Sequence, residues 1–428
     1  MNHRSVRMTA GILLAMALMS GCAQENVGTP HPVDRLNYPV SVTAGPEGKV
    51  LWAVSGNFDL SYRGGAIVGI DPASHEFMAD AAVEIGSYPG PITLFSSDDE
   101  GMSGYVLSRE TDALYHLQMS PREGGGYDLD CGDGEILSSG IERCAGTNTF
   151  VSGTTEDDQG VETAVEVGPD PYGSLVRYGR DDANGYHEPD LLMTGAMVDG
   201  TVMTFELDPL TGAPSWGSTI NLDQGLFAMA EHPGSGRIYT SGKVNNVFNV
   251  LEVQPSLVDA TEDNKTNATL DLALVDIITI PVAGAGDDAR GMAFSEDGSR
   301  LYVAYRTPHS LVVVNTGESL EGNPLDKVLT KIPVGSRPGD VIVAPATDDS
   351  PELVYVSCLN DDTIDVVDPA LGMRIARIDT GRGPFGMTMI QNDTLRRLYV
   401  ANFFSHSIGV IELDPQSPYY QTQIAEIR

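Results

Sequence analysis

Gly291-Met-Ala-Phe-Ser-Glu-Asp-Gly-Ser-Arg-Leu-Tyr-Val-Ala304 decides the fold, because the chain repeats its Tyr-Val run twice more before it ends. The repeats are Leu353-Val-Tyr-Val-Ser357 and Arg397-Leu-Tyr-Val-Ala-Asn402, whose tyrosines lie 53 and then 44 residues further along the chain. Each run is followed, across a polar turn, by a second apolar run: Ser310-Leu-Val-Val-Val-Asn315, Thr363-Ile-Asp-Val-Val-Asp368 and Ser407-Ile-Gly-Val-Ile-Glu-Leu-Asp414. Short β runs at such a period are typical of propeller blades.

A Gly-x-x-Pro step marks the passage from one repeat to the next. It occurs as Gly86/Pro89, Gly168/Pro171, Gly335/Pro338 and Gly381/Pro384. We expect glycine to supply a permissive dihedral here, while proline fixes φ and prevents the chain from continuing the old ladder. The apolar runs that open a repeat give seven innermost strands, beginning near Pro39, Pro91, Gly173, Leu226, Gly291, Asp340 and Gly386.

The runs that close a repeat also number seven. They cover residues 77–85, 163–167, 218–222, 276–282, 328–334, 374–380 and 421–427. The sequence therefore predicts an all-β fold: a seven-bladed β-propeller of four-stranded antiparallel blades over residues 38–428, whose radial closure avoids long exposed edges. Because residues 421–427 can complete the last blade, the N-terminus need not supply a strand there.

The repeat resembles the YVTN family of β-propeller repeats, in which an Asp-Gly turn precedes a Tyr-Val strand and a Val-x-Val-Ile-Asp strand follows. Arg300-Leu-Tyr-Val-Ala304 and Arg397-Leu-Tyr-Val-Ala-Asn402 carry this resemblance, which is strongest over roughly the last third of the chain. Members of this repeat class are mostly binding or scaffold modules. The resemblance thus implies a fold, and the function must be argued from the site.

Residues 1–22 have the features of a bacterial lipoprotein signal peptide. Arg4 and Arg7 precede an apolar run from Met8 to Met19 that is too short to span a bilayer, and Met19-Ser-Gly-Cys22 is similar to a lipobox. We expect lipid on Cys22, a polar tether over residues 23–37, and an outer-membrane lipoprotein that faces the periplasm or the cell surface. An ordinary signal peptide with a chance cysteine is the alternative.

The chain is strongly acidic, with 60 Asp and Glu residues against 25 Lys and Arg residues and a net charge of −35. Such a field repels nucleic acid and anionic lipid surfaces, so we expect no nucleic-acid partner and membrane contact only through the lipid anchor. Most of the acidic residues are scattered through turns, which favours a solvated acidic surface.

Three further cysteines can be placed from their surroundings. Cys131 and Cys144 lie 13 residues apart in a Gly-, Ser- and Asp-rich stretch, which predicts a disulfide in an oxidising compartment. A metal site is the alternative, but no histidine or further cysteine lies nearby. We expect the disulfide to order its loop without supporting the propeller core. Cys358 lies inside a strand and is expected to be free and buried.

Two repeats are oversized: the second carries an insertion over residues 120–162, and the fourth carries one over residues 254–274. Long loops on a rigid scaffold either carry function or are merely tolerated. The first insertion contains Asp128-Leu-Asp-Cys-Gly-Asp-Gly-Glu135, whose carboxylates suit a hard cation. Its spacing departs by one residue from the calcium-loop pattern, so a solvated acidic turn competes with a calcium site there.

No catalytic signature is present: the chain has no Gly-x-Ser-x-Gly elbow, phosphate loop, His-Glu-x-x-His or Cys-x-x-Cys-His motif. The candidate site therefore comes from topology. In a propeller, the turns between second and third strands share a face with the crossovers between blades. On this face we expect the candidate binding residues Arg63, Arg109, Arg290, Arg306, His309, Arg337, Arg382 and His406. Ordinary turn residues that pair locally with Asp59, Asp112, Asp288, Asp340 and Asp361 are the alternative.

These features favour a monomeric, non-enzymatic binding or scaffold lipoprotein that uses no cofactor or metal and holds a protein or polysaccharide partner on its loop face. The alternative is an enzyme on the same fold, either a lactonase-like hydrolase or a dehydrogenase subunit. A lactonase would need a carboxylate, an amide and a histidine that converge on the channel. The inner runs Met292-Ala-Phe294 and Met387-Thr-Met389 do not suggest such a set.

Overall fold

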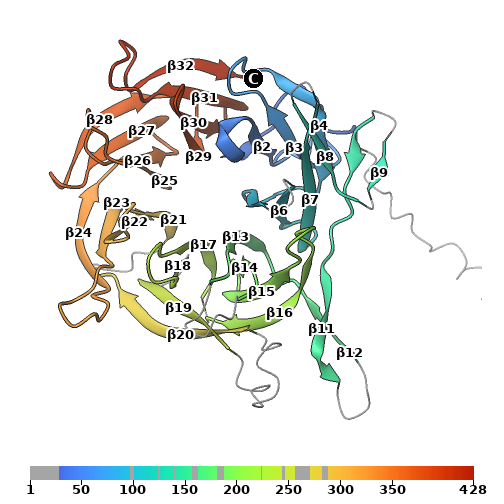
Figure 1. The fold of residues 1–428 in the computed structure, drawn as a ribbon. Helices are drawn as coiled ribbons and strands as arrows, with labels where there is room; N and C mark the ends of the chain where they lie inside the picture. Colours follow the sequence, from blue (N-terminus) through green and yellow to red (C-terminus); the bar gives the residue numbers. More distant parts are fainter. Residues whose placement is uncertain are drawn as a thin grey trace, which may run out of the picture.

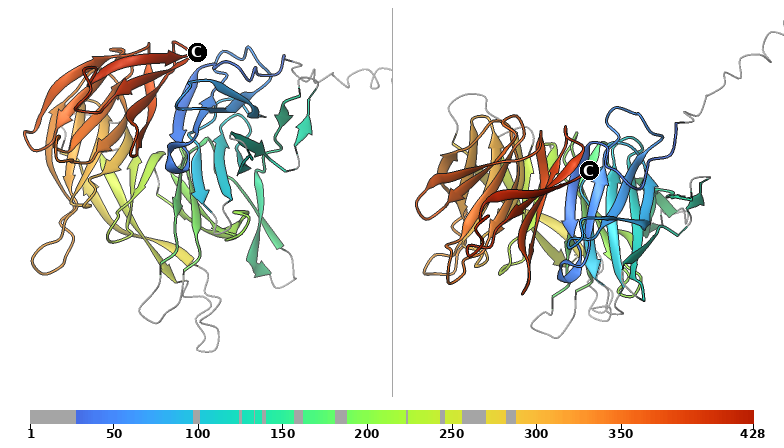
Figure 2. Two further views of the ribbon diagram at one scale, coloured as in Figure 1. Left: turned by 45° about the horizontal axis from the view of Figure 1, so that its top comes forward. Right: turned by 90° about the horizontal axis from the view of Figure 1, so that it is seen from above.

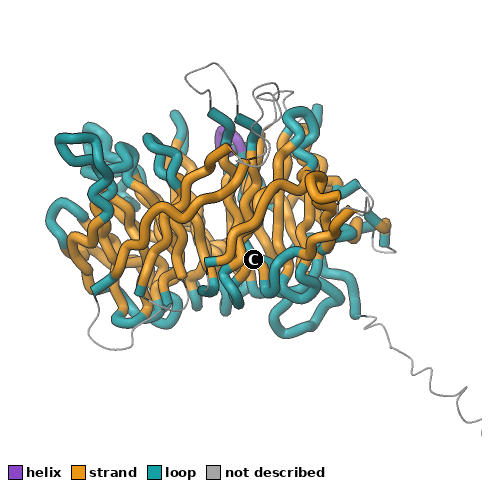
Figure 3. Tube along the Cα trace, turned by 90° about the horizontal axis from the view of Figure 1, so that it is seen from below, coloured by secondary structure: helices purple, strands orange, loops and turns teal. Residues whose placement is uncertain are grey.

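The computed structural model describes residues 28–96, 101–123, 126–132, 134–137, 140–156, 162–180, 188–222, 224–242, 246–255, 270–281 and 288–428. These residues form seven antiparallel blades arranged radially around a channel, with their loops gathered at two faces (Figures 1, 2 and 3). The predicted seven-bladed propeller is therefore confirmed. In the described part of the chain, no helix is long and apolar enough to cross a membrane. The expected lipidation site, Cys22, lies outside the described residues.

Each blade runs outward from the channel in chain order. Blade one contains β1 (Pro39–Ala44), β2 (Leu51–Ser55), β3 (Gly65–Ile70) and β4 (Phe77–Ile85), with the short 3-10 turn η1 (Pro46–Gly48) after β1. Blade two contains β5 (Thr93–Ser96), β6 (Met102–Ser108), β7 (Ala113–Pro121) and β8 (Tyr127–Asp130). Blade three contains β13 (Pro171–Arg177), β14 (Leu191–Ala196), β15 (Thr201–Leu207) and β16 (Pro214–Asn221).

The remaining blades follow the same order. Blade four contains β17 (Leu226–Glu231), β18 (Ile238–Gly242), β19 (Val247–Pro255) and β20 (Leu270–Thr279). Blade five contains β21 (Ala289–Phe294), β22 (Arg300–Arg306), β23 (His309–Asn315) and β24 (Lys327–Pro333). Blade six contains β25 (Pro338–Ala344), β26 (Leu353–Cys358), β27 (Thr363–Asp368) and β28 (Met373–Asp379). Blade seven contains β29 (Pro384–Gln391), β30 (Arg396–Asn402), β31 (Ser407–Glu412) and β32 (Thr422–Ile427).

The repeated tyrosines lie in second strands and connect neighbouring blades. Tyr302, Tyr355 and Tyr399 are fully buried, because a second strand is covered on both faces by adjacent blades. The Tyr302 hydroxyl donates to Glu352 Oε1 of blade six at 2.7 Å, and the Tyr399 hydroxyl donates to the Pro72 carbonyl of blade one at 3.4 Å. The ring thus fills the space between two blades while its hydroxyl keeps a hydrogen-bond partner.

Blade two differs from the prediction at its outer edge. We expected residues 163–167 to form its outermost strand, but β8 fills that position, and β12 (Glu162–Glu166) pairs with β11 (Thr149–Glu156) in a separate ribbon. After β8 the chain crosses to blade one, where β9 (Glu135–Ile136) and β10 (Glu142–Arg143) extend the sheet beyond β4. It then returns to blade two, where Leu114 and Thr147 exchange backbone hydrogen bonds of 2.9 and 3.0 Å.

The predicted disulfide between Cys131 and Cys144 is present and joins the end of β8 to the end of β10. Cys144 is only 6% exposed and belongs to a core cluster that includes Trp52, Val83 and Tyr127. The bridge therefore packs into the core instead of ordering only a separate loop, while its contribution to stability stays a prediction. As predicted, Cys358 is free and buried. Part of the acidic stretch 128–135 is described: Asp128 forms an ion pair with Arg122, and Asp130 accepts a hydrogen bond from Gly132 N.

The ring closes without a shared strand, because blade one and blade seven are each complete sheets. Hydrogen bonds cross the seam from Ala44 N to Thr388 Oγ1 at 3.2 Å and from Asn392 Nδ2 to the Glu47 carbonyl at 3.1 Å. Residues 28–37 of the expected tether lie against blade one, where His31 is 2% exposed. Most of the predicted insertion 254–274 lies outside the described residues, which resume in blade four at Leu270.

The Gly-x-x-Pro step works differently from our expectation. The left-handed residue is the one directly before proline: Tyr88 has φ 55°, Asp170 56°, Arg337 52° and Gly383 70°. The leading glycines are needed for close approach instead. A Cβ on Gly335 would lie 2.6 Å from Asp361 Oδ2 and 2.8 Å from Cys358 Sγ. Glycine therefore lets the crossover pack onto the end of the second strand, and the residue directly before proline makes the turn.

Candidate functional site

A pocket lies at the channel mouth, on the face formed by the blade crossovers and the turns after the second strands. Its cavity volume is about 250 Å³. All seven blades contribute to it. The lining consists of four arginines, six aromatic residues and three aliphatic residues: Arg109, Arg290, Arg306 and Arg337; Phe58, Tyr172, Phe227, Phe385, Phe403 and Phe404; and Val40, Met197 and Leu359. We call this the mouth pocket.

The crossovers position this lining through their backbone. In blade one, Gly56 N donates to the carbonyl of left-handed Tyr38 at 3.1 Å, outside the pocket lining. In five further blades, the carbonyl of the left-handed crossover residue likewise accepts a hydrogen bond from the residue that follows, or ends, the second strand. The donors are Arg109, Met197, Arg306, Leu359 and Phe403, with N···O distances of 2.9 to 3.3 Å. Every one of these donors lines the mouth pocket. The left-handed turn thus places a carbonyl within hydrogen-bonding distance of the end of the second strand. This bond fixes the position of the residue whose side chain lines the pocket.

Two crossover residues also hold arginines through their side chains. Asp170 forms an ion pair with Arg109, whose Nη2 lies 3.2 Å from Asp170 Oδ2. Asp288 Oδ1 lies 2.5 Å from Arg290 Nε, and its Oδ2 lies 3.5 Å from Arg306 Nη1. Asp170 and Asp288 have φ values of 56° and 97°, a region that Asp tolerates better than most residues. One residue type therefore makes the turn and orients the guanidinium beside it.

In blade six, the crossover residue is not an aspartate but is itself an arginine. Arg337 is exposed, and within the described residues it has no carboxylate partner. Arg306 is 7% exposed and also donates from Nε to the Pro338 carbonyl at 3.0 Å. Burial, followed by repulsion from Arg290, lowers the pKa of Arg306 to about 10, although Asp288 opposes the shift. The mouth pocket therefore holds more positive charge than its carboxylates neutralise.

The aromatic residues of the pocket were not identified from the sequence. Tyr172 and Phe227 have ring centroids 4.6 Å apart, and the Arg290 guanidinium lies 4.4 Å from the Phe227 centroid. Phe403 contacts Phe58 at 4.9 Å and Phe404 at 5.1 Å between centroids. These rings could have been found from a regular signal, since each follows a second strand or lies near the start of an innermost strand.

Four of the eight predicted binding residues line the mouth pocket, and four do not. Arg63 is paired with the fully buried Glu84 at 3.0 Å. His406 lies in the seam, where its Nδ1 accepts a hydrogen bond from Tyr38 N at 3.2 Å. Arg382 is exposed beside the rim and donates from Nη2 to the Phe404 carbonyl at 3.1 Å. His309 is exposed at the start of β23.

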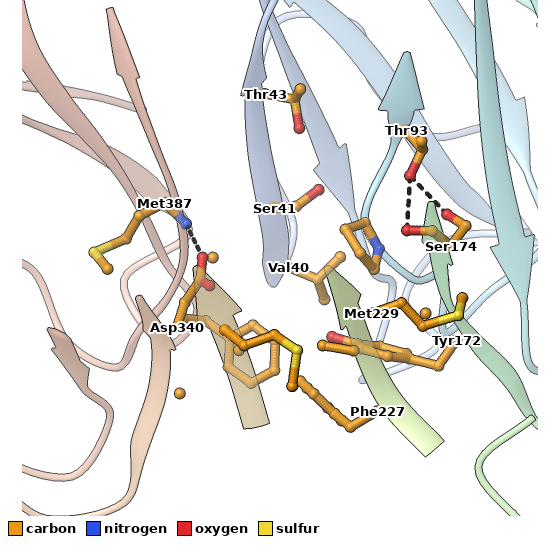
Figure 4. A pocket seen from close by; sticks show the side chains of 18 of the residues that line it. Val40, Ser41, Thr43, Thr93, Tyr172, Ser174, Phe227, Met229, Asp340 and Met387 are labelled. Carbon is orange, nitrogen blue, oxygen red and sulfur yellow. Dashed lines mark hydrogen bonds between the residues drawn. The ribbon is translucent and has the colours of Figure 1, made fainter. Parts of the chain in front are cut away.

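A second cavity of about 240 Å³ continues along the channel and shares Val40, Tyr172, Phe227 and Phe385 with the mouth pocket. Its one carboxylate is Asp340, and its lining contains no histidine and no side-chain amide. Asp340 Oδ2 accepts a hydrogen bond from Met387 N at 2.8 Å, as Figure 4 shows. Burial raises the pKa of Asp340 to about 6, although bonds from Met387 N and Val341 N oppose the shift.

No family model and no curated protein matches the chain. Solved structures do match it. Hydrazine synthase of Kuenenia stuttgartiensis is 15% identical with a TM-score of 0.54, over 90% of this chain and 98% of that chain. The periplasmic gluconolactonase PpgL of Pseudomonas aeruginosa is 14% identical with a TM-score of 0.53, over 91% and 95%. A putative 6-phosphogluconolactonase of Bacteroides fragilis is 12% identical with a TM-score of 0.51, over 81% and 86%. At such identities the similarity supports the fold alone.

Proposed function

We propose that this protein is a YVTN-type propeller lipoprotein of the outer membrane, which acts as a monomeric, non-enzymatic module that binds a protein or polysaccharide partner at the mouth pocket. The observation that carries the proposal is electrostatic. Four arginines line one pocket, while none of its lining residues carries a carboxylate, on a protein of net charge −35. An anionic or mixed-charge partner should therefore prefer this pocket to the acidic remainder of the protein surface.

Capture of the partner from envelope extract tests this proposal. Arg337→Gln combined with Arg382→Ala should weaken capture, because it removes two exposed cations at the pocket and its rim. Ile136→Asp is the control, since Ile136 is 68% exposed in β9 of the disulfide loop and lies outside the pocket lining. Retention by the arginine variant together with loss by Ile136→Asp would move the binding surface to the disulfide loop.

The lipid anchor is tested separately. Cys22→Ser should abolish uptake of labelled fatty acid and should release the protein from the membrane fraction, because no other cysteine stands at a lipobox-like sequence. A variant that still takes up label and still sediments with membranes would refute the anchor.

An enzyme is the second candidate, and Asp340 is the observation that favours it. A partly buried carboxyl whose pKa is about 6 can exchange a proton near neutral pH, as a general acid or base requires. The channel lining lacks the histidine and amide that a lactonase-like site would add, and nothing specific favours a dehydrogenase subunit. Lactone hydrolysis that is lost in Asp340→Asn, or a stoichiometric metal in the purified protein, would favour the enzyme over the binding module.

A further inference from the structure

The lining of the mouth pocket specifies the chemistry of its ligand, and this inference rests on the function proposed above. Among the described residues, four guanidinium groups meet two carboxylates there: Asp170 is paired with Arg109, and Asp288 is shared by Arg290 and Arg306. Arg337 has no carboxylate partner among the described residues. Charge balance therefore leaves room for an anion, and the fork of Arg337 can take a carboxylate through two hydrogen bonds.

Burial strengthens this preference. Arg290 is 8% exposed and Arg306 is 7% exposed, so their charges are weakly screened by solvent. Burial is also the main cause of the lowered pKa of Arg306, and repulsion from Arg290 and Arg337 adds to it. A bound anion would relieve this repulsion. A neutral or cationic ligand would leave it in place.

The remainder of the lining is apolar, with six aromatic and three aliphatic residues. Tyr172 and Phe227 lie at the start of blades three and four, where Phe385 of blade seven packs against them, and the Phe385 and Phe403 ring centroids are 6.0 Å apart. Phe404 is 43% exposed at the rim. Flat rings provide large apolar contact area and favour offset or edge-to-face contact with another ring. Acetate or inorganic phosphate would leave these rings unused.

The cavity also limits ligand size. A volume of about 250 Å³ equals roughly eight water molecules at about 30 Å³ each. That space fits one or two fused rings with an acid group, so a larger partner would enter it with one such group only.

We propose that the mouth pocket binds an aromatic carboxylate, with the carboxylate on Arg337 and the ring among Phe227, Phe403 and Phe404. The group is either a free aromatic acid or the same chemistry presented by the partner. Recognition combines a charge-assisted hydrogen bond with ring burial, so neither half of the ligand suffices alone.

Calorimetric titration of the protein isolated from expressing cells tests this. The probes are 1-naphthoate, the neutral 1-naphthamide and acetate, which separate the charge from the ring. Naphthoate should bind at least about tenfold more tightly than either of the others, since one hydrogen bond to a charged group corresponds to about that factor. Equal binding of naphthamide would overturn the role of the anion, and equal binding of acetate would overturn the role of the ring.

Two single-residue variants test whether naphthoate binds in the mouth pocket. Arg337→Gln and Phe404→Ala should each weaken naphthoate binding, by about tenfold and by several-fold, because both side chains are exposed and their removal leaves the core intact. Arg428→Ala is the matched control: it also removes one exposed arginine, but from the end of the chain and outside the pocket. Unchanged affinity in both pocket variants would overturn the placement, and so would an equal loss in Arg428→Ala.

Two further results separate this inference from the proposed function. If naphthoate does not bind while partner capture still depends on Arg337, the ligand class is wrong and the binding module stands. If naphthoate binds through Arg337 while capture ignores that residue, the ligand class stands and the partner surface is elsewhere. Displacement of the captured partner by naphthoate would show a partner-borne group, whereas simultaneous binding would support a free aromatic acid and refute the partner-borne one.

Discussion

Arg337 combines a costly backbone conformation with a charge that has no carboxylate partner in the part of the chain that the structure describes. Its φ of 52° lies in the left-handed region, where a non-glycine residue loses about 1–2 kcal/mol. The equivalent position in blade seven is Gly383, which adopts φ 70° without that cost. Strained residues of this kind persist where the surroundings fix them, and they are concentrated at functional sites. The crossover residues of four other blades also adopt a positive φ: Tyr38, Tyr88, Asp170 and Asp288. This strain therefore belongs to the turn, and the charge of Arg337 is what distinguishes its position.

Substitution at this position separates stability from binding. Arg337→Gly should be more stable than Arg337→Ala by about 1 kcal/mol, because only glycine removes the Cβ that opposes a positive φ. Both variants should lose naphthoate binding. Urea unfolding at neutral pH measures the difference in the free energy of unfolding. Equal stability of the two variants would show that the crossover relaxes to a negative φ when the arginine is absent.

His31 makes the docking of the N-terminal segment depend on pH. The side chain is 2% exposed, its Nδ1 lies 2.8 Å from the Pro32 carbonyl, and its backbone N–H donates to Glu84 Oε2 at 3.1 Å. Burial lowers the pKa of His31 to about 4, partly opposed by the Pro32 bond. Because the folded pKa lies below the unfolded value, the neutral ring contributes stability above pH 6.5. That contribution is lost as pH falls from 6.5 to 4.

The corresponding prediction is a loss of up to about 3 kcal/mol across this window, since one pKa unit corresponds to about 1.36 kcal/mol. His31→Phe keeps a ring against Tyr62 but cannot be protonated. The free energy of unfolding at pH 7 and pH 5 should therefore fall less in this variant than in the unmodified protein. Identical pH dependence in the two proteins would mean that other groups control acid stability.

At the level of elements, the disulfide loop connects blades one and two. Cys144 N donates to the Glu84 carbonyl at 2.9 Å, and β10 pairs in parallel with β4. The loop therefore covers the edge of a sheet that would otherwise end at β4. Because the chain then reaches the β11–β12 ribbon, whose Phe150 and Val165 pack with Phe205 of blade three, the insertion links three consecutive blades.

Removing the disulfide should thus destabilise the body of the protein. Cys131→Ala combined with Cys144→Ala should lower the free energy of unfolding by about 3 kcal/mol, the value expected for closing a loop of 13 residues. Thermal unfolding followed by tryptophan fluorescence is a suitable measurement, because Trp52 shares the core cluster of Cys144. An unchanged melting temperature would show that the loop folds independently of blade one.

The wrongly predicted outermost strand of blade two shows what could not be inferred from the sequence. Ala164-Val-Glu-Val-Gly168 closely matches Ala82-Val-Glu-Ile-Gly86, so the same role was expected for both. The sequence pattern correctly predicted a strand before a crossover. The sequence of one strand does not specify which neighbouring strand it pairs with. β8 has four residues, which are too few to give a recognisable strand pattern in the sequence. Regular repeats therefore predicted seven blades and the arginines of the mouth pocket, whereas the aromatic lining arises from single residues brought together by closure of the ring.

At the scale of the molecule, repulsion between the acidic residues opposes closure of the propeller ring. A net charge of −35 repels itself and disfavours the compact state. The ring closes between blades one and seven through packing and hydrogen bonds, without a strand that belongs to both. The mouth pocket lies where all seven blades meet, so its excess positive charge sits at the centre of an acidic ring. Attraction between the acidic body and this centre offsets part of the repulsion.

Salt should therefore change stability and binding in opposite directions. Raising the ionic strength from about 0.01 M to about 0.15 M shortens the screening length from roughly 30 Å to roughly 8 Å. The melting temperature should rise, because repulsion among the acidic residues is screened, while naphthoate binding should weaken, because its attraction to Arg337 is screened too. Arg337→Gln should keep the first effect and lose most of the second. A melting temperature that falls with salt would mean that local ion pairs outweigh the net charge, and naphthoate binding that tightens with salt would show that the ring, and not the carboxylate, dominates recognition at the mouth pocket.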